Sequence, residues 1–170
     1  DLSGEQWVKD TTEAISIDGK VYGFPVCVEA RGIIYNADAI KAITGTDFDP
    51  ASVKTLDDFN ALLAALKSGG MASPTGIMKE DWSLAAHYLA EGYEQDDPDA
   101  FIQGLHDGSI HMADDAIFNS MMDTFDALKA NNYAEANAIS AEREVTEQNL
   151  AEGTLAFMFG GNWDWSVINQ

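Results

Sequence analysis

Short apolar runs, rich in β-branched residues, alternate along the chain with longer stretches that are apolar on one helical face. This alternation predicts strands interleaved with helices, and therefore an α/β fold. Strands are expected on both sides of the Asp18-Gly19 turn and at residues 31–36, 75–78 and 154–159. Helices are expected at residues 3–14, 37–43, 56–68, 82–91, 114–129, 145–152 and 162–169, and a further helix is expected to start at Pro98.

Local signals mark where several of these helices begin and end. Thr55 and Asp58 form a capping pattern ahead of a helix, and Gly69-Gly70 ends that helix. Asp97-Pro98 suits a helix start, because proline is tolerated at the first helical position. Gly45 and Gly92 are expected to end two further helices.

The chain is strongly acidic, with nine basic and twenty-nine acidic residues among 170 and a net charge of −20. Such a charge excludes nucleic-acid and anionic-membrane binding, which require a basic face. It favours a neutral or cationic ligand. The single cysteine, Cys27, lies in an apolar run and is expected to be buried, so no disulfide framework holds the fold. No apolar run is long enough to span a membrane.

The end of the chain carries the most specific signal. The strand at 154–159 runs into Gly160-Gly161 and then into a helix start that bears Asn162 and Trp163. Open α/β sheets bind ligands outside the carboxyl ends of their strands. An indole at such a corner is suited to a flat and partly apolar partner, for example a sugar ring.

Two blocks in this order and separation resemble family 1 extracellular solute-binding proteins of ABC importers. The first consists of DGKVYGFP at 18–25 with EARGIIYN at 29–36, and the second is FMFGGNWDW at 157–165. The nearest group within this family is the carbohydrate binders related to maltose-binding protein. The resemblance covers nearly the whole chain.

The resemblance implies an α/β lobe of the periplasmic-binding-protein type, with a mixed sheet flanked by helices, that is incomplete relative to the two-lobed family fold. Residues 1–30 would belong to or border the first lobe and the hinge. Residues 31–170 would form most of the second lobe, with 31–36 as a strand that crosses between lobes. We therefore expect the natural protein to begin before Asp1 and to continue past Gln170.

The resemblance also implies ligand-binding residues. Trp163 matches a ring-stacking tryptophan of the family, against the alternative of a core residue. Trp82 matches, by position rather than by identical residues, a place in the maltose-binding group where an aromatic ring and carboxylates contact sugar. Trp165 is expected in the core, and Asn162 is expected to cap the last helix or to donate to a hydroxyl group.

Four charged residues complete the candidate site. Glu29 matches an acidic residue that accepts hydrogen bonds from sugar hydroxyls, although it could also be an ordinary surface acid. Arg31, one of two arginines, either binds ligand or pairs with an acid such as Glu29. Glu80 and Asp81 precede Trp82 and are weaker candidates.

These features favour a binding protein that performs no chemistry and needs no cofactor. The histidines at 87, 106 and 111 lack metal-ligand spacing. Two alternatives remain: the same fold binding a polyamine, peptide or metal complex, and a glycoside hydrolase that uses Glu29 with Glu80. The latter would need its carboxyl groups held roughly 5 to 9.5 Å apart.

The expected partners and location follow from the resemblance. The ligand would be a mono- or oligosaccharide, and the closed form would be offered to the membrane permease of an ABC importer. The protein would be extracellular, as a cell-surface lipoprotein or in the periplasm. The isolated segment would lack its partner lobe and could self-associate through exposed apolar surface.

Overall fold

A computed structural model describes residues 4–6, 16–23, 27–134 and 141–169 of the chain. The chain divides into two compact units, residues 1–30 and 31–170. In the first unit, β1 (Ser16–Ile17) and β2 (Lys20–Val21) pair in antiparallel fashion. Asp18 and Gly19 have φ values of 50° and 72°, so this predicted hairpin turn is confirmed. Most of the helix expected at 3–14 lies outside the described residues.

The prediction that Cys27 is buried is wrong. Its side chain is exposed, and its thiol lies 3.9 Å from the Glu29 carboxylate, which is also exposed. An apolar stretch becomes buried only where another element covers it. In the described part of this short unit, no strand pairs with residues 27–30.

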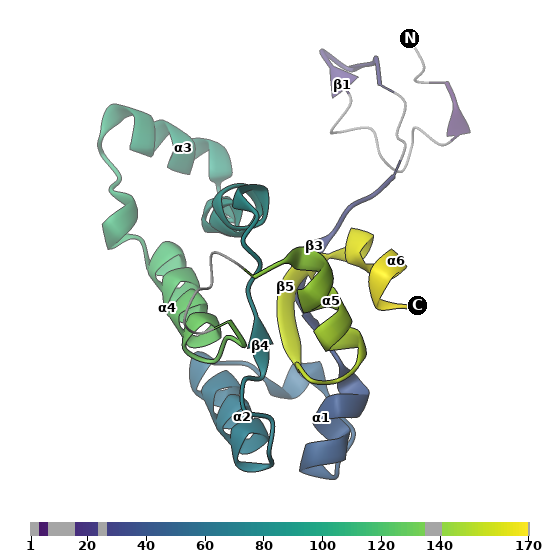
Figure 1. Ribbon diagram of the computed structural model, residues 1–170. Helices are drawn as coiled ribbons and strands as arrows, with labels where there is room; N and C mark the ends of the chain where they lie inside the picture. The colour runs from purple at the N-terminus through teal and green to yellow at the C-terminus, as the bar shows by residue number, and fades with distance from the viewer. Residues whose placement is uncertain (1–3, 7–15, 24–26, 135–140, 170) are drawn as a thin grey trace. The chain divides into compact units, whose positions relative to one another are not determined.

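The second unit contains a mixed three-stranded sheet in the order β3-β5-β4 (Figure 1). The central strand β5 (Phe157–Gly161) pairs antiparallel with β3 (Arg31–Tyr35) and parallel with β4 (Thr75–Gly76). The β3–β5 register sets Arg31 opposite Gly161 and Tyr35 opposite Phe157. Because β4 and β5 are parallel, their carboxyl ends lie at the same edge of the sheet.

Strand β5 is buried on both faces, and its alternating side chains divide the interior into two cores. Phe157 and Phe159 pack with the core that contains the apolar residues of α2 (Leu56–Ser68) and α4 (Ala116–Ala130). Met158 packs into the other core, together with Leu150 of α5 (Arg143–Ala151). This arrangement places helices on both sides of the sheet and explains why β5 is apolar throughout.

The described α-helices are α1 (Ala37–Thr44), α2 (Leu56–Ser68), α3 (Pro98–Asp107), α4 (Ala116–Ala130), α5 (Arg143–Ala151) and α6 (Trp165–Ile168). Short 3₁₀ turns occur at Pro50–Ser52, Glu91–Tyr93, Met112–Asp114 and Asn162–Asp164. The predicted start signals are confirmed, because Thr55 and Asp58 form a reciprocal capping box and Asp97 caps α3 ahead of Pro98. Gly45 ends α1 with a φ of 75°.

Elements that lead to the candidate site differ from the sequence prediction. The helix expected at 82–91 is a π-helix over Trp82–Tyr88, and Gly92 lies inside the following 3₁₀ turn. Gly92 is small for packing reasons, because a Cβ there would lie 3.2 Å from the Phe118 ring. The last strand is also shifted, since β5 includes both Gly160 and Gly161.

None of the described helices has the length and apolar character needed to cross a bilayer.

Candidate functional site

The two predicted stacking tryptophans follow the carboxyl ends of neighbouring parallel strands. β4 leads through residues 77–81 to Trp82, and β5 leads directly through Asn162 to Trp163. The carboxyl edge of parallel strands is where open α/β sheets place their ligands. The fold thus brings together two residues that are far apart in the sequence.

Three rings form an aromatic cluster: Trp82, His87 and Trp163. The Trp82 and Trp163 centroids are 6.3 Å apart with an interplanar angle of 65°, an edge-to-face arrangement. His87 contacts both, at 5.3 Å from Trp82 and 5.1 Å from Trp163. The π-helix helps to bring Trp82 and His87 together, because i→i+5 bonding stacks residues five apart on one face.

The glycine pair before Trp163 makes room for this corner. A Cβ at Gly161 would stand 2.4 Å from carbons of the Trp163 ring, and a Cβ at Gly160 would stand 2.2 Å from Asp164 Oδ2. Their φ angles are not left-handed. The glycines are therefore needed because a ring and a carboxylate lie directly against the strand.

Beside the cluster lies an ion network of Arg143, Glu147 and Asp164. The Arg143 Nε donates to Asp164 Oδ1 at 3.1 Å, its Nη2 donates to the same oxygen, and Nε lies 2.9 Å from Glu147 Oε1. Both carboxylates are buried. Burial, and after it the hydrogen bond with Asp164, raises the pKa of Glu147 to about 7. The guanidinium carbon of Arg143 is 5.3 Å from the Trp82 ring centroid.

Several buried polar atoms at or next to the cluster have no hydrogen-bond partner among the described residues. They are Trp163 Nε1, His87 Nδ1 and Glu80 Oε2. Buried polar groups in folded proteins are normally hydrogen-bonded, so such atoms need an explanation. A donor, a ring nitrogen and a carboxylate oxygen match the mixed donor and acceptor character of hydroxyl groups.

The remaining sequence-predicted residues have local partners. Arg31 pairs with Glu91 at 2.6 Å and lies 3.8 Å from Glu94. It therefore pairs with these two acids rather than with Glu29. Asp81 is exposed and accepts from the Trp82 backbone N–H at 2.8 Å. Glu29 belongs to the first unit. Its role in binding, like that of the other candidates, stays a prediction.

Two expectations near the last strand are wrong. Trp165 is 63% exposed, because the short helix α6 turns Ile168, and not Trp165, onto the core. Asn162 does not cap the terminal helical segment, since it is the first residue of the 3₁₀ turn. The capping interaction belongs to Asp164, whose Oδ2 accepts from the Gly161 N–H at 2.8 Å.

Sequence reasoning missed Arg143, Glu147 and Asp164, and it considered His87 only as a metal ligand. Asp164 lies within the motif that was singled out, between two tryptophans. Arg143 had one usable signal, because it is the only arginine besides Arg31. Nothing in the sequence connects α5 to Trp82, since that contact depends on tertiary packing.

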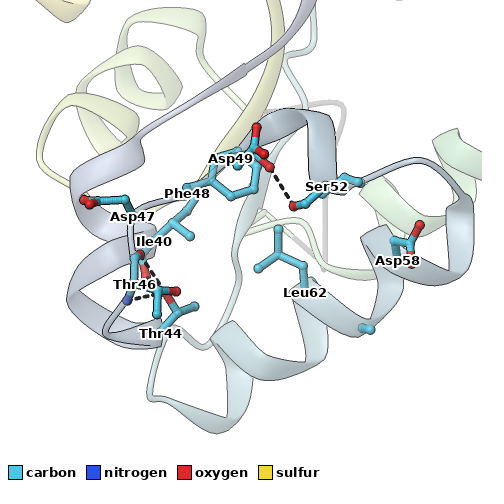
Figure 2. A pocket seen from close by; sticks show the side chains of 11 residues that line it. Ile40, Thr44, Thr46, Asp47, Phe48, Asp49, Ser52, Asp58 and Leu62 are labelled. Carbon is cyan, nitrogen blue, oxygen red and sulfur yellow. Dashed lines mark hydrogen bonds between the residues drawn. The ribbon is translucent and has the colours of Figure 1, made fainter.

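A separate pocket of about 450 Å³ lies between α1 and α2 (Figure 2). Phe48 on its wall contacts Phe157, the first residue of β5, so the pocket lies at the opposite end of that strand from Trp163. Its acidic groups serve local structure: Asp49 caps the 3₁₀ turn at Pro50–Ser52, the Asp58 carboxylate accepts from the Thr55 N–H in the capping box of α2, and Asp47 pairs with Lys41. None of the predicted site residues lines it. We therefore place the candidate site at the aromatic cluster.

The described residues contain no cluster of three or more histidine, cysteine, aspartate or glutamate side chains that could hold a metal ion. What the site offers is an aromatic surface with hydrogen-bonding atoms beside it, which suits reversible recognition of a small molecule.

Known proteins share this fold. RafE from Streptococcus pneumoniae in its apo form has a TM-score of 0.71 at 23% identity over 99% of this chain and 44% of its own. The complex of RafE with raffinose has a TM-score of 0.72 at 22% identity, again over 99% of this chain and 44% of its own. A sugar transporter from Bacillus licheniformis in complex with stachyose has a TM-score of 0.64 at 21% identity. The match covers 94% of this chain and 42% of the transporter chain. A family 1 extracellular solute-binding protein from Bifidobacterium longum subsp. infantis has a TM-score of 0.53 at 25% identity. The match covers 100% of this chain and 44% of that protein's chain.

The chain therefore spans less than half of the length of these solved proteins. The predicted α/β class, with a mixed sheet that matches part of the periplasmic-binding-protein fold, is confirmed. The model of the bacterial extracellular solute-binding protein family matches residues 1–170. This family is non-enzymatic. From its full-length match, and in agreement with the resemblance in its sequence, the chain belongs to the family of bacterial extracellular solute-binding proteins.

Proposed function

We propose that this chain supplies one wall of a saccharide-binding cleft in a protein that delivers sugar to an ABC importer. The observation that carries the proposal is the meeting of Trp82 and Trp163 at the carboxyl edge of β4 and β5. Both rings are half-buried, so they are held in place and keep some surface toward solvent. The opposite wall of the cleft would come from the other lobe.

The chemistry of the cluster supports a sugar. Indole faces bind the polarised C–H groups of pyranose rings through dispersion and apolar burial. The unpartnered Trp163 Nε1, His87 Nδ1 and Glu80 Oε2 would form hydrogen bonds with hydroxyl groups of the ligand. Solved neighbours of the same fold hold raffinose and stachyose, which supports an oligosaccharide as the first ligand class to test.

The charged candidates would have secondary roles. Glu29 would accept hydrogen bonds from sugar hydroxyls after the lobes close. Arg31 is engaged with Glu91 and Glu94, so it would fix the edge of the site rather than grip the ligand. Asp81 and Asn162, both exposed, would contribute only at the rim.

A cationic ligand is the second candidate, because the net charge of −20 would attract it. The position of Arg143 argues against it, since a guanidinium already occupies the cation–π position at Trp82, 5.3 Å from the ring centroid. A polyamine would have to approach next to this positive charge. A neutral saccharide meets no such repulsion.

The location and the partner follow from the family. The complete protein would act outside the cytoplasm, as a cell-surface lipoprotein or in the periplasm, and would dock on a membrane permease. In isolation, this chain exposes Ile33 and Tyr35 on β3 as well as Trp165, so we expect it to self-associate.

The test is a thermal-shift and calorimetric screen of the complete protein with raffinose, stachyose and spermidine. We expect a sugar to stabilise the protein and Trp163→Ala to abolish this effect. Trp165→Ala is the matched control, because it removes an exposed indole two residues away. Stabilisation by spermidine alone would favour the cationic alternative. A sugar shift that Trp163→Ala leaves unchanged would remove the aromatic cluster from the site.

A further inference from the structure

Arg143 lies between the two segments that carry the tryptophans. It is the first residue of α5, and its guanidinium carbon is 5.3 Å from the centroid of the Trp82 ring. On its other side it donates two hydrogen bonds to one oxygen of Asp164, the residue after Trp163. A single side chain thus contacts the ring of one tryptophan and the immediate neighbour of the other.

Asp164 is itself held firmly. It has no exposed surface, and its second oxygen accepts from the Gly161 N–H at 2.8 Å. The lack of space for a Cβ at Gly160 shows that this carboxylate lies directly on the strand. Because both oxygens of the buried Asp164 are hydrogen-bonded, the guanidinium that binds it is held beside Trp163.

The contacts use properties that only arginine combines. A guanidinium is flat, so it can donate through Nε and Nη2 to a carboxylate while another part of the group lies near an aromatic ring. The ammonium of lysine is a compact point charge that cannot do both. Glu147, one helical turn along α5, adds a third contact at 2.9 Å from Nε.

We propose that Arg143 is a positioning residue that holds Trp82 at its angle to Trp163 and thereby sets the shape of the ligand-stacking surface. The ligand need not touch it. Without the guanidinium, Trp82 would keep its ring contacts with His87 and Trp163 but lose the contact that links its ring through Arg143 to the buried Asp164. The consequence for ligand binding rests on the proposed function, whereas the effect on ring geometry does not.

The geometry has its own spectroscopic test. Two indoles with centroids 6.3 Å apart and planes at 65° are close enough to couple, so we expect an exciton couplet in the ultraviolet circular dichroism of the complete protein. Trp82→Phe identifies that couplet by difference, which separates it from the contributions of other tryptophans. Arg143→Met and Arg143→Lys should both weaken the couplet, because neither side chain can bond Asp164 and lie on Trp82 together.

The affinity for raffinose, or for whichever screened sugar binds, should fall about tenfold in both variants, as expected for the loss of one cation–π contact and its orientation. Lys41→Met is the matched control, since it removes a cation from an exposed ion pair on α1. It should leave both the couplet and the affinity unchanged.

The outcomes separate the two ideas. A wild-type protein that binds no sugar contradicts the proposed function, while the couplet still reports on Arg143. A couplet that survives unchanged in a folded Arg143→Met protein overturns the positioning role. Should Arg143→Met fail to fold, Arg143→Lys, which keeps the charge beside Asp164, decides in the same way: an unchanged couplet refutes the role and a weakened one supports it.

Discussion

The ring of Trp163 lies directly against Gly161, so closely that a Cβ on residue 161 would stand 2.4 Å from two of its ring carbons. This contact explains the second glycine of the motif without any appeal to backbone strain, because φ at Gly161 is −145°. An extended backbone accepts any residue. The side chain of Trp163 is what excludes one.

We therefore predict that Gly161→Ala displaces the Trp163 ring and weakens ligand binding about tenfold or more, while the backbone of β5 is preserved. Calorimetry with the sugar that binds the wild type measures the affinity. Tryptophan fluorescence reports whether the environment of the Trp163 ring has changed.

Gly32→Ala is the matched control for this variant. Gly32 lies opposite Gly160 on β3, and a Cβ there would meet nothing within 4 Å. Equal losses of affinity in the two variants would show that the sheet, and not the ring, suffers from the substitution.

The stability of the protein should depend on Glu147 at neutral pH. Its pKa rises from 4.5 in the unfolded chain to about 7 in the fold because it is buried and lies beside Asp164. Between these values the folded state holds a proton that the unfolded state has lost. This contribution to stability is therefore complete below about pH 4.5 and is lost as the pH rises through 7.

Urea unfolding at about pH 5 and pH 8 measures this effect. We expect the wild type to be less stable at the higher pH and Glu147→Gln, which cannot ionise, to lose much of this difference. The window lies above the lowered pKa values of Asp58 and Asp107, so these groups do not contribute. The same pH dependence in both proteins would assign it to another group.

The capping box of α2 gives a local prediction. Thr55 Oγ1 accepts from the Asp58 N–H at 3.1 Å, and Asp58 Oδ2 accepts from the Thr55 N–H at 3.0 Å. Thr55→Ala should cost about 1 kcal/mol of unfolding free energy, because it leaves an N–H of the first turn unsatisfied. It should also raise the pKa of Asp58, which the Thr55 hydroxyl holds below its usual value.

Thr55→Ser keeps the hydroxyl group and is the control for this prediction. It should retain most of the stability and the low pKa of Asp58, the latter followed by NMR titration of the carboxyl carbon. A serine variant as unstable as the alanine variant would show that the threonine methyl group, rather than the cap, matters.

The elements that the sequence could predict are those governed by neighbours in the chain. The capping box at Thr55, the Asp18-Gly19 turn and the helix start at Pro98 all depend on contacts within a few residues. The strand at 31–36 could be located from its β-branched residues. Its antiparallel pairing with β5 required the tertiary structure, because register is a relation between distant segments.

The site shows the same division. Trp163 could be singled out because a strand, two glycines and an indole are adjacent in the chain. Arg143 could not, since its contacts with Trp82 and Asp164 cross between segments. The pairing of Trp82 with His87 was hidden for another reason. A residue five positions along falls on a different face of an α-helix, and only the π-helix aligns the two.

Asn36, the last residue of one of the blocks that identify the family, should contribute to stability through two bonds. Its Oδ1 accepts from the Ala39 N–H at 2.9 Å and caps α1, and its Nδ2 donates to the Leu150 carbonyl of α5 at 2.7 Å. Asn36→Ala removes both and should cost about 2 kcal/mol. Asn36→Asp keeps the cap but loses the donor, so urea unfolding should place it between alanine and wild type; an aspartate variant as stable as wild type would show that the bond to α5 contributes nothing.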